Sequence, residues 1–148
     1  MTTAADPRPP SPADMARTSP AARRAAERLA LMLAPAPLPE GARFRPEFGR
    51  AMLTSQMGPH PRLVALTLSL YGSYATGHIP TEKQPRLHGL TRATGLHAGQ
   101  VVIALRTLQD RGWISCTGSQ DYTRADLRPR IPQHHMDALR QQNTTASN

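Results

Sequence analysis

The sequence predicts a mainly α-helical fold with a small β-hairpin. Apolar residues recur at helical spacing in several stretches of the 148-residue chain, and one glycine, Gly95, joins two of these stretches. Short β-prone segments then flank a turn-rich stretch, which is typical of a hairpin. With 39% hydrophobic residues and 15 prolines, the chain has the apolar area for one compact domain with tails.

The first third of the chain predicts a tail, a helix and a linker. Residues 1–19 are rich in Pro, Ala, Thr and Asp and offer little apolar area to bury, so we expect a disordered tail. Ser19 can cap a helix over 20–34, in which alanines, leucines and a methionine form one apolar stripe. Alternating prolines over 35–42 predict a stiff, extended linker.

We expect the folded domain over 43–131. Pro46 fits the first turn of a helix that ends at Gly58. A second helix, over 62–74, is apolar on nearly every side and should lie at the centre of the core. Beyond the domain, 132–148 should hold a short helix and a disordered tail. The inward-facing residues of the first helix are Phe48, Met52 and Met57.

Residues 90–113 predict two helices joined by a turn of fixed geometry, a helix-turn-helix. Gly95 supplies the left-handed residue that ends the first helix, and Gly112 ends the second. In such pairs the second helix is the one that enters the major groove of DNA. The apolar residues that recur at the i, i+3, i+4, i+7 spacing of the second helix are Val101, Ala104, Leu105 and Leu108.

Residues 113–117 and a returning strand within 122–131 predict the hairpin. Its tip is either a two-residue turn at Gly118-Ser119 or a longer loop, which we favour. Pro129 cannot donate a backbone hydrogen bond, so the returning strand must lie at a sheet edge. Three arginines lie near the tip: Arg124, Arg128 and Arg130. They could contact DNA phosphates or a minor groove, or they could serve only to keep the exposed strand edge solvated.

The segment 90–114 resembles the winged helix-turn-helix of bacterial regulators of the GntR type. The resemblance rests on Leu90, Ala93, Gly95, Leu96, Val101, Ala104, Leu105, Leu108, Gly112, Trp113 and Ile114. It implies a three-helix core with a two-stranded wing, here with an extra N-terminal helix, and DNA binding in transcription regulation. More loosely, residues 63–85 resemble helix-turn-helix domains of actinobacterial mobile-element and replication proteins, through Thr76-Gly77, Ile79-Pro80 and Gln84-Pro85.

The outward face of the second helix carries the candidate contacts to DNA bases, which are His97, Gln100, Ile103 and Arg106. Candidate contacts to the DNA backbone are Arg62, His88, Arg92, Arg124, Arg128 and Arg130. Only one residue of the outward face is basic, and apolar side chains interrupt it. The alternative is therefore a protein-interaction module that docks on another regulator or on a polymerase. Its candidate contacts are Val102, Ile103, Leu29, Met32 and Leu33.

The formal net charge of +8 and the pI near 11.2 favour an anionic partner, double-stranded DNA in particular. A homodimer and another regulatory protein are further candidate partners. Seventeen of the eighteen basic residues are arginine, which is typical of a GC-rich, actinobacterial source. One cysteine excludes an intramolecular disulfide, and no membrane span or signal peptide is evident, so we expect a cytoplasmic protein. We expect no catalytic site, metal or cofactor, because the sequence has no phosphate loop, paired carboxylates or Cys/His cluster.

Overall fold

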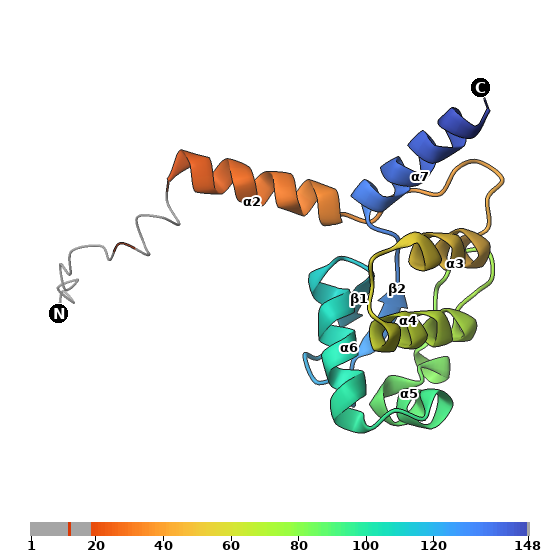
Figure 1. Cartoon of the computed structure of the whole chain (residues 1–148). Helices are drawn as coiled ribbons and strands as arrows, with labels where there is room; N and C mark the ends of the chain where they lie inside the picture. Colours follow the sequence, from red (N-terminus) through yellow and green to blue (C-terminus); the bar gives the residue numbers. More distant parts are fainter. Residues whose placement is uncertain (1–11, 13–18, 148) are drawn as a thin grey trace, which may run out of the picture. The chain divides into compact units, whose positions relative to one another are not determined.

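The computed structural model describes residues 12 and 19–147. The tail predicted over 1–19 therefore lies almost entirely outside the described residues. The chain divides into two compact units, Met1–Met32 and Leu33–Asn148, whose helices and strands are labelled in Figure 1.

Helix α2 (Pro20–Leu33) comprises most of the described residues of the first unit and ends at the first residue of the second. It begins at the predicted cap, since the Ala22 N–H donates a hydrogen bond to Ser19 Oγ at 3.1 Å. No α2 residue is buried, and the side chains of Leu29 and Met32 are 55% and 45% exposed. The apolar stripe of this helix is therefore turned to solvent.

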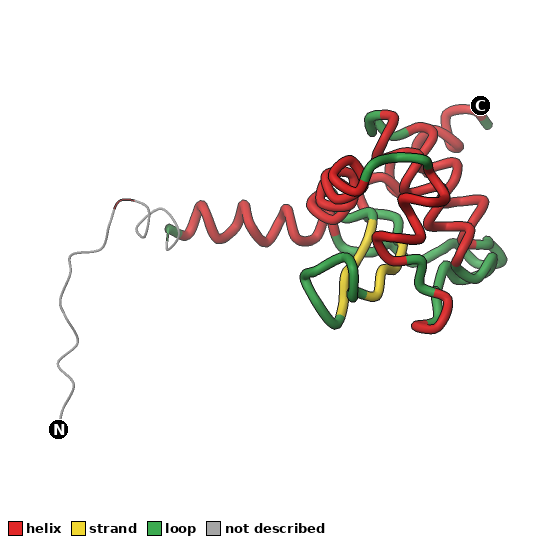
Figure 2. Tube along the Cα trace, turned by 90° about the horizontal axis from the view of Figure 1, so that it is seen from below, coloured by secondary structure: helices red, strands yellow, loops and turns green. Residues whose placement is uncertain are grey.

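The second unit is mainly helical and has one two-stranded antiparallel sheet, as the sequence predicts. In chain order its elements are α3 (Phe44–Thr54), α4 (Pro59–Tyr71), the 3-10 turn η1 (Thr81–Lys83), α5 (Arg86–Thr94), α6 (Ala98–Asp110), β1 (Ile114–Thr117), β2 (Asp126–Pro129) and α7 (Gln133–Ala146). Helix α4 lies at the centre of this unit and packs against α3, α5 and α6 (Figure 1). The two strands run side by side next to the helices (Figure 2).

The core of the second unit draws on all of its α-helices and both strands. Its largest fully buried side chains are Phe48, Met52, Leu68, Leu90, Leu105, Leu108, Ile114, Leu127, Ile131 and Met136. Helix α4 lies at the centre as predicted, but part of its apolar surface is not buried, because Leu63 and Leu70 are 41% and 65% exposed. Tyr74 lies beyond its C-terminal end and is also exposed. Although α4 contacts α3, α5, α6 and β2, one of its faces remains open to solvent.

Helix α3 begins at Phe44, two residues before the predicted start at Pro46. Pro46 occupies the third helical position, where the backbone N–H has no intrahelical partner, so the missing donor costs nothing there. The Phe44 N–H instead bonds to the Ala75 carbonyl at 3.0 Å. The helix ends at Thr54, earlier than the predicted end at Gly58.

Residues 35–42, expected to be a linker, lie against the core of the second unit. The Ala36 N–H donates to the Ile131 carbonyl at 2.9 Å. Ala36 and Leu38 are also half-buried against core side chains. Alternating prolines favour the extended backbone, as predicted. The residues between the prolines supply the hydrogen bond and the apolar contacts that attach the segment to the core.

Strands β1 and β2 pair in antiparallel register, from Ile114 opposite Pro129 to Thr117 opposite Asp126. Their connection spans 118–125, so the longer of the two expected tips is the one present. Pro129 is tolerated because, among residues 12 and 19–147, β1 is the strand that pairs with β2 and the other, outer edge of β2 has no strand beside it.

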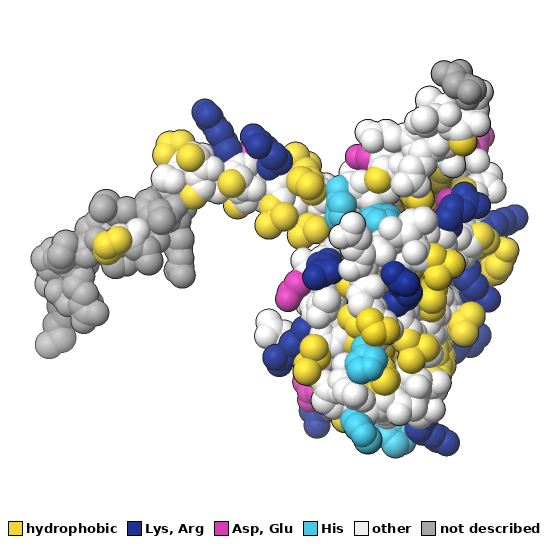
Figure 3. All heavy atoms as spheres, in the orientation of Figure 1, with side chains coloured by type: hydrophobic (Ala, Val, Ile, Leu, Met, Phe, Trp, Pro, Cys, Tyr) yellow, Lys and Arg dark blue, Asp and Glu magenta, His cyan; other side chains and the backbone are white. Residues whose placement is uncertain are grey.

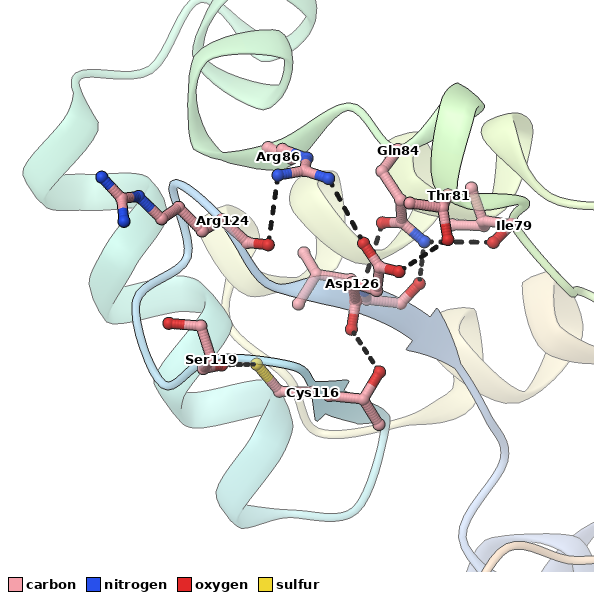
Figure 4. A network of polar contacts seen from close by, with 10 residues as sticks. Ile79, Thr81, Gln84, Arg86, Cys116, Ser119, Arg124 and Asp126 are labelled. Atoms are coloured by element: carbon pink, nitrogen blue, oxygen red, sulfur yellow. Dashed lines mark hydrogen bonds and ion pairs between the residues drawn. The ribbon is translucent and has the colours of Figure 1, made fainter.

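A glutamine side chain takes the place of a third strand on that outer edge (Figure 4). Gln84 Nε2 donates to the Leu127 carbonyl at 2.9 Å, and Gln84 Oε1 accepts from the Leu127 N–H at 2.9 Å. The same Nε2 donates to the Ile79 carbonyl at 3.1 Å. Thr81 Oγ1 donates to Asp126 Oδ2 at 2.8 Å. These hydrogen bonds fasten the hairpin to the segment that precedes α5.

Helix α7 packs back on the domain through Met136 and Leu139, which are both buried. It runs to Ala146 and so includes residues that were expected to belong to a tail. The His135 ring packs edge-on against Trp113, with ring centroids 4.9 Å apart. Burial and then the neighbouring His134 lower the pKa of His135.

Acid should weaken the docking of α7 through His135. Because the pKa of His135 is lowered by folding, the unfolded chain binds more protons than the folded protein below about pH 6.5, the ordinary histidine pKa. The contribution of His135 to stability is therefore complete above that pH and is lost as the pH falls. We expect the urea midpoint of the full chain to fall between about pH 7.5 and about pH 5.5, and to fall less in His135→Phe. An equally steep fall in that variant would assign the effect to other groups.

Candidate nucleic-acid interface

The predicted turn between α5 and α6 is present. Gly95 ends α5 with φ 73°, and its N–H donates to the Thr91 carbonyl at 3.0 Å. Two residues later His97 precedes the first turn of α6, where the His97 N–H donates to Gln100 Oε1 at 2.9 Å. Leu96 lies between the helices and packs against the core. The inner face of α6 consists of Val101, Ala104, Leu105 and Leu108, all buried as predicted.

The opposite face of α6 is open to solvent. Ile103 is 68% exposed, and His97 and Arg106 are exposed as well. Ile103 and Arg106 therefore lie on one accessible face of α6, and His97 is exposed at the N-terminal end of the helix. Asp110 is the acidic side chain that α6 adds to this face.

Gln100 and Val102 are less exposed than predicted. Gln100 is half-buried, and its Oε1 accepts the His97 N–H, so one lone pair of that oxygen is already used and the side chain is held at the start of α6. Its amide nitrogen remains available as a donor. Val102 was expected to be exposed beside Ile103, but it is half-buried and packs against the core. Only Ile103 of this apolar pair projects into solvent.

Two of the six candidate backbone contacts are tied to the protein's own carbonyl groups. Arg62 Nη2 donates to the Ser55 carbonyl at 3.0 Å and so joins α4 to the end of α3. Arg130 Nε donates to the Gly112 carbonyl at 3.1 Å, at the base of the hairpin and not at its tip. Burial lowers the pKa of Arg130. Arg62 and Arg130 each use one donor on the protein's own backbone and are half-buried, so they are less accessible to phosphates than the other four candidates. The other four are exposed: His88, Arg92, Arg124 and Arg128.

The loop of the hairpin is attached to both helices of the pair. The Leu87 N–H at the start of α5 donates to the Tyr122 carbonyl at 3.1 Å. The Tyr122 hydroxyl donates to Gln109 Oε1 on α6 at 2.8 Å. These two bonds fix the position of the loop relative to α5 and α6.

Arg86 connects the loop to the hairpin (Figure 4). Its Nη1 donates to the Arg124 carbonyl at 3.1 Å, and its Nη2 lies 3.5 Å from Asp126 Oδ1. The Arg124 side chain itself points away from this network (Figure 4). The arrangement holds the Arg124 backbone in place, and the exposed Arg124 guanidinium interacts electrostatically with Asp121.

Sequence reasoning missed Gln84, Arg86 and Tyr122 as the residues that position the hairpin. Arg86 has φ 55°, a left-handed conformation that is uncommon for a residue other than glycine. No pattern in the sequence marks it, because the contacts that hold it come from residues about forty positions further on.

The surface of the second unit also carries apolar side chains outside the α6 face. Hydrophobic side chains gather over α4 in the view of Figure 3, consistent with the exposure of Leu63 and Leu70. The candidate interface is thus mixed in character: cationic at Arg92, Arg106 and Arg124, and apolar at Ile103.

The described residues include histidines, acidic residues and one cysteine, Cys116. No group of three or more His, Cys, Asp or Glu side chains there is placed to hold a metal ion. Burial raises the pKa of the Cys116 thiol, which donates to the Ser119 carbonyl at 3.2 Å. Within the part of the chain that the structure describes, no helix has the length and apolar character to cross a membrane. Comparison with family models, with curated protein sequences and with solved structures finds no match to this chain.

Proposed function

We propose that the second unit binds double-stranded DNA as a winged helix-turn-helix module, with α6 in the major groove and the hairpin as the wing. The observation that carries the proposal is the division of α6 into one buried face and one open face, with Ile103 68% exposed beside Arg106. The formal charge of +8 supports an anionic partner. The biological setting that we propose is transcription regulation or the control of a mobile element.

Each exposed side chain has a chemical role in this proposal. Arg106 can donate to a guanine edge or to a phosphate, and Ile103 can pack on a thymine methyl group. A good bidentate contact to a base discriminates by about 1–3 kcal/mol. Arg92 on α5 and the hairpin arginines Arg124 and Arg128 would contact phosphates on either side of the groove and fix the register of α6.

Binding to a mixed-sequence duplex should weaken steeply with salt. Three phosphate contacts, from Arg92, Arg124 and Arg128, give a slope of about −2.7 in a plot of log affinity against log salt, so affinity should drop about 40-fold between about 50 mM and about 200 mM salt. Fluorescence anisotropy of the full chain with a labelled duplex measures this. Arg124→Ala should reduce the slope by about one contact.

The matched control is Arg140→Ala, which removes an equal charge from the exposed face of α7. It should change affinity by less than about twofold, whereas Arg106→Ala should weaken binding to a selected preferred duplex by about tenfold or more. Equal effects of the two substitutions, or no affinity even at low salt, would contradict the proposal.

A second candidate function is docking on a protein, and the 68% exposure of Ile103 at the middle of the open face favours it. If a protein partner covers Ile103, its binding should be unchanged by Arg106→Ala and abolished by Ile103→Asp. A crosslinked pull-down that recovers both DNA fragments and proteins separates the two functions. If the function is docking on a protein, the unmodified chain should capture a protein and enrich no DNA fragment. The Ile103→Asp variant should no longer capture that protein.

A further inference from the structure

A hollow of about 430 Å³ lies on the outer side of the hairpin, within the second unit. Apolar side chains line most of it, with contributions from the extended segment, α3 and the end of β2. They include Ala36, Leu38, Phe44 and Ile131. Ser115 and two arginines, Arg128 and Arg130, complete the lining. Ligand sites in proteins have this size and this combination of apolar walls with a few polar groups.

The two arginines face the hollow from one side of β2. Arg128 lies opposite Ser115 in the strand register, and Arg130, two residues further on, is on the same face. Neither forms an ion pair with a carboxylate among the described residues, where the arginine ion pairs involve Arg50, Arg86 and Arg140. Neither guanidinium at the hollow is therefore neutralised by an ion pair with a described carboxylate.

Arg130 is also partly buried at the hollow. One of its nitrogens, Nε, is used by the Gly112 carbonyl, and burial lowers the pKa of the side chain. Arginine nevertheless stays charged at neutral pH. A partly buried cation without a counter-charge is unfavourable, and an anion bound beside it would offset that cost.

We propose that this hollow binds a small organic anion with an apolar body, such as a carboxylate on an aromatic ring or a short hydrocarbon chain. The apolar walls remove the body of the ligand from water, and the planar guanidinium of Arg128 can hold a carboxylate through two parallel hydrogen bonds. The site does not depend on DNA binding. Since Arg128 is also a candidate phosphate contact, a bound anion would compete with DNA for that side chain.

The test is a titration of the full chain, ¹⁵N-labelled, with phenylacetate and with octanoate, followed by amide chemical shifts. Each carboxylate should give saturable shifts at Ala36, Ser115, Arg128 and Ile131. The neutral analogues phenylacetamide and octanamide have nearly the same shapes and should bind about tenfold more weakly or worse, because they lack the charge. No saturable shift with either carboxylate, or equal affinities of a carboxylate and its amide, would overturn the proposal.

The variant that tests the charge is Arg128→Gln, whose exposed side chain can be replaced without disturbing the core. It should weaken carboxylate binding about tenfold. Arg124→Gln removes the same charge from the hairpin loop, outside the lining of the hollow, and should leave carboxylate affinity within about twofold. Equal losses in the two variants would point to general electrostatic attraction and would also overturn the proposal. Neither result bears on whether α6 binds DNA.

Discussion

Gly77→Ala should lower the free energy of unfolding of the second unit by about 2–5 kcal/mol. Gly77 has φ 74°, a left-handed conformation that costs an alanine about 1–2 kcal/mol. An added Cβ would also lie 2.4 Å from Cδ1 of the Phe44 ring. That ring is buried and stacks on Phe48 at 5.2 Å between centroids, so it has little room to move. Overpacking of this kind costs about 1–3 kcal/mol more.

Urea unfolding of the full chain, followed by circular dichroism, measures the loss. Gly95→Ala is the matched control, because Gly95 has nearly the same φ, 73°, but nothing lies within 4 Å of an added Cβ. It should cost about 1–2 kcal/mol, the conformational part alone. If both variants lose the same stability, the contact with Phe44 has no energetic weight and the expectation for Gly77 is wrong.

Gln84→Met should destabilise the second unit by about 2–4 kcal/mol, because it removes three hydrogen bonds and leaves their backbone partners unpaired. Methionine keeps the length of the side chain, so packing changes little. The Leu127 N–H would lose its partner on an edge where Leu127 itself is 1% exposed. Two measurements apply: the urea midpoint, and hydrogen exchange at the Leu127 amide, which should become faster.

Gln120→Met serves as the control for Gln84, since Gln120 is exposed in the hairpin loop. It should change stability by less than about 0.5 kcal/mol and leave exchange at Leu127 unchanged. Unaltered protection of Leu127 in Gln84→Met would mean that other groups hold the hairpin in place.

The helix pair and the hairpin were predictable because local rules determine them. A glycine in the left-handed region ends α5, the i, i+3, i+4, i+7 pattern gives the buried face of α6, and Pro129 restricts β2 to an edge. The same pattern identified the open face of α6, on which Ile103 and Arg106 lie.

What the sequence could not supply are contacts between residues far apart in the chain. Arg62 and Arg130 look like any other arginine until the fold brings a carbonyl group to each. Gln84 pairs with Leu127 across 43 positions, because its side-chain amide forms two hydrogen bonds of the kind that a neighbouring strand would form. A contact of this kind produces no periodic pattern in the sequence. Composition also misjudged residues 35–42, because prolines that stiffen a segment do not determine whether it lies against the core.

The attachment of the hairpin loop to α5 and α6, through the Leu87 N–H and the Tyr122 hydroxyl, has a consequence for the proposed complex with DNA. The spacing between Arg106 and the Arg124 backbone is set before any encounter, so the protein cannot adapt to duplexes of different shape. The protein should then prefer DNA sites whose groove width already suits that spacing, or whose base-pair steps deform at little energetic cost. This preference should extend to base pairs that no side chain contacts.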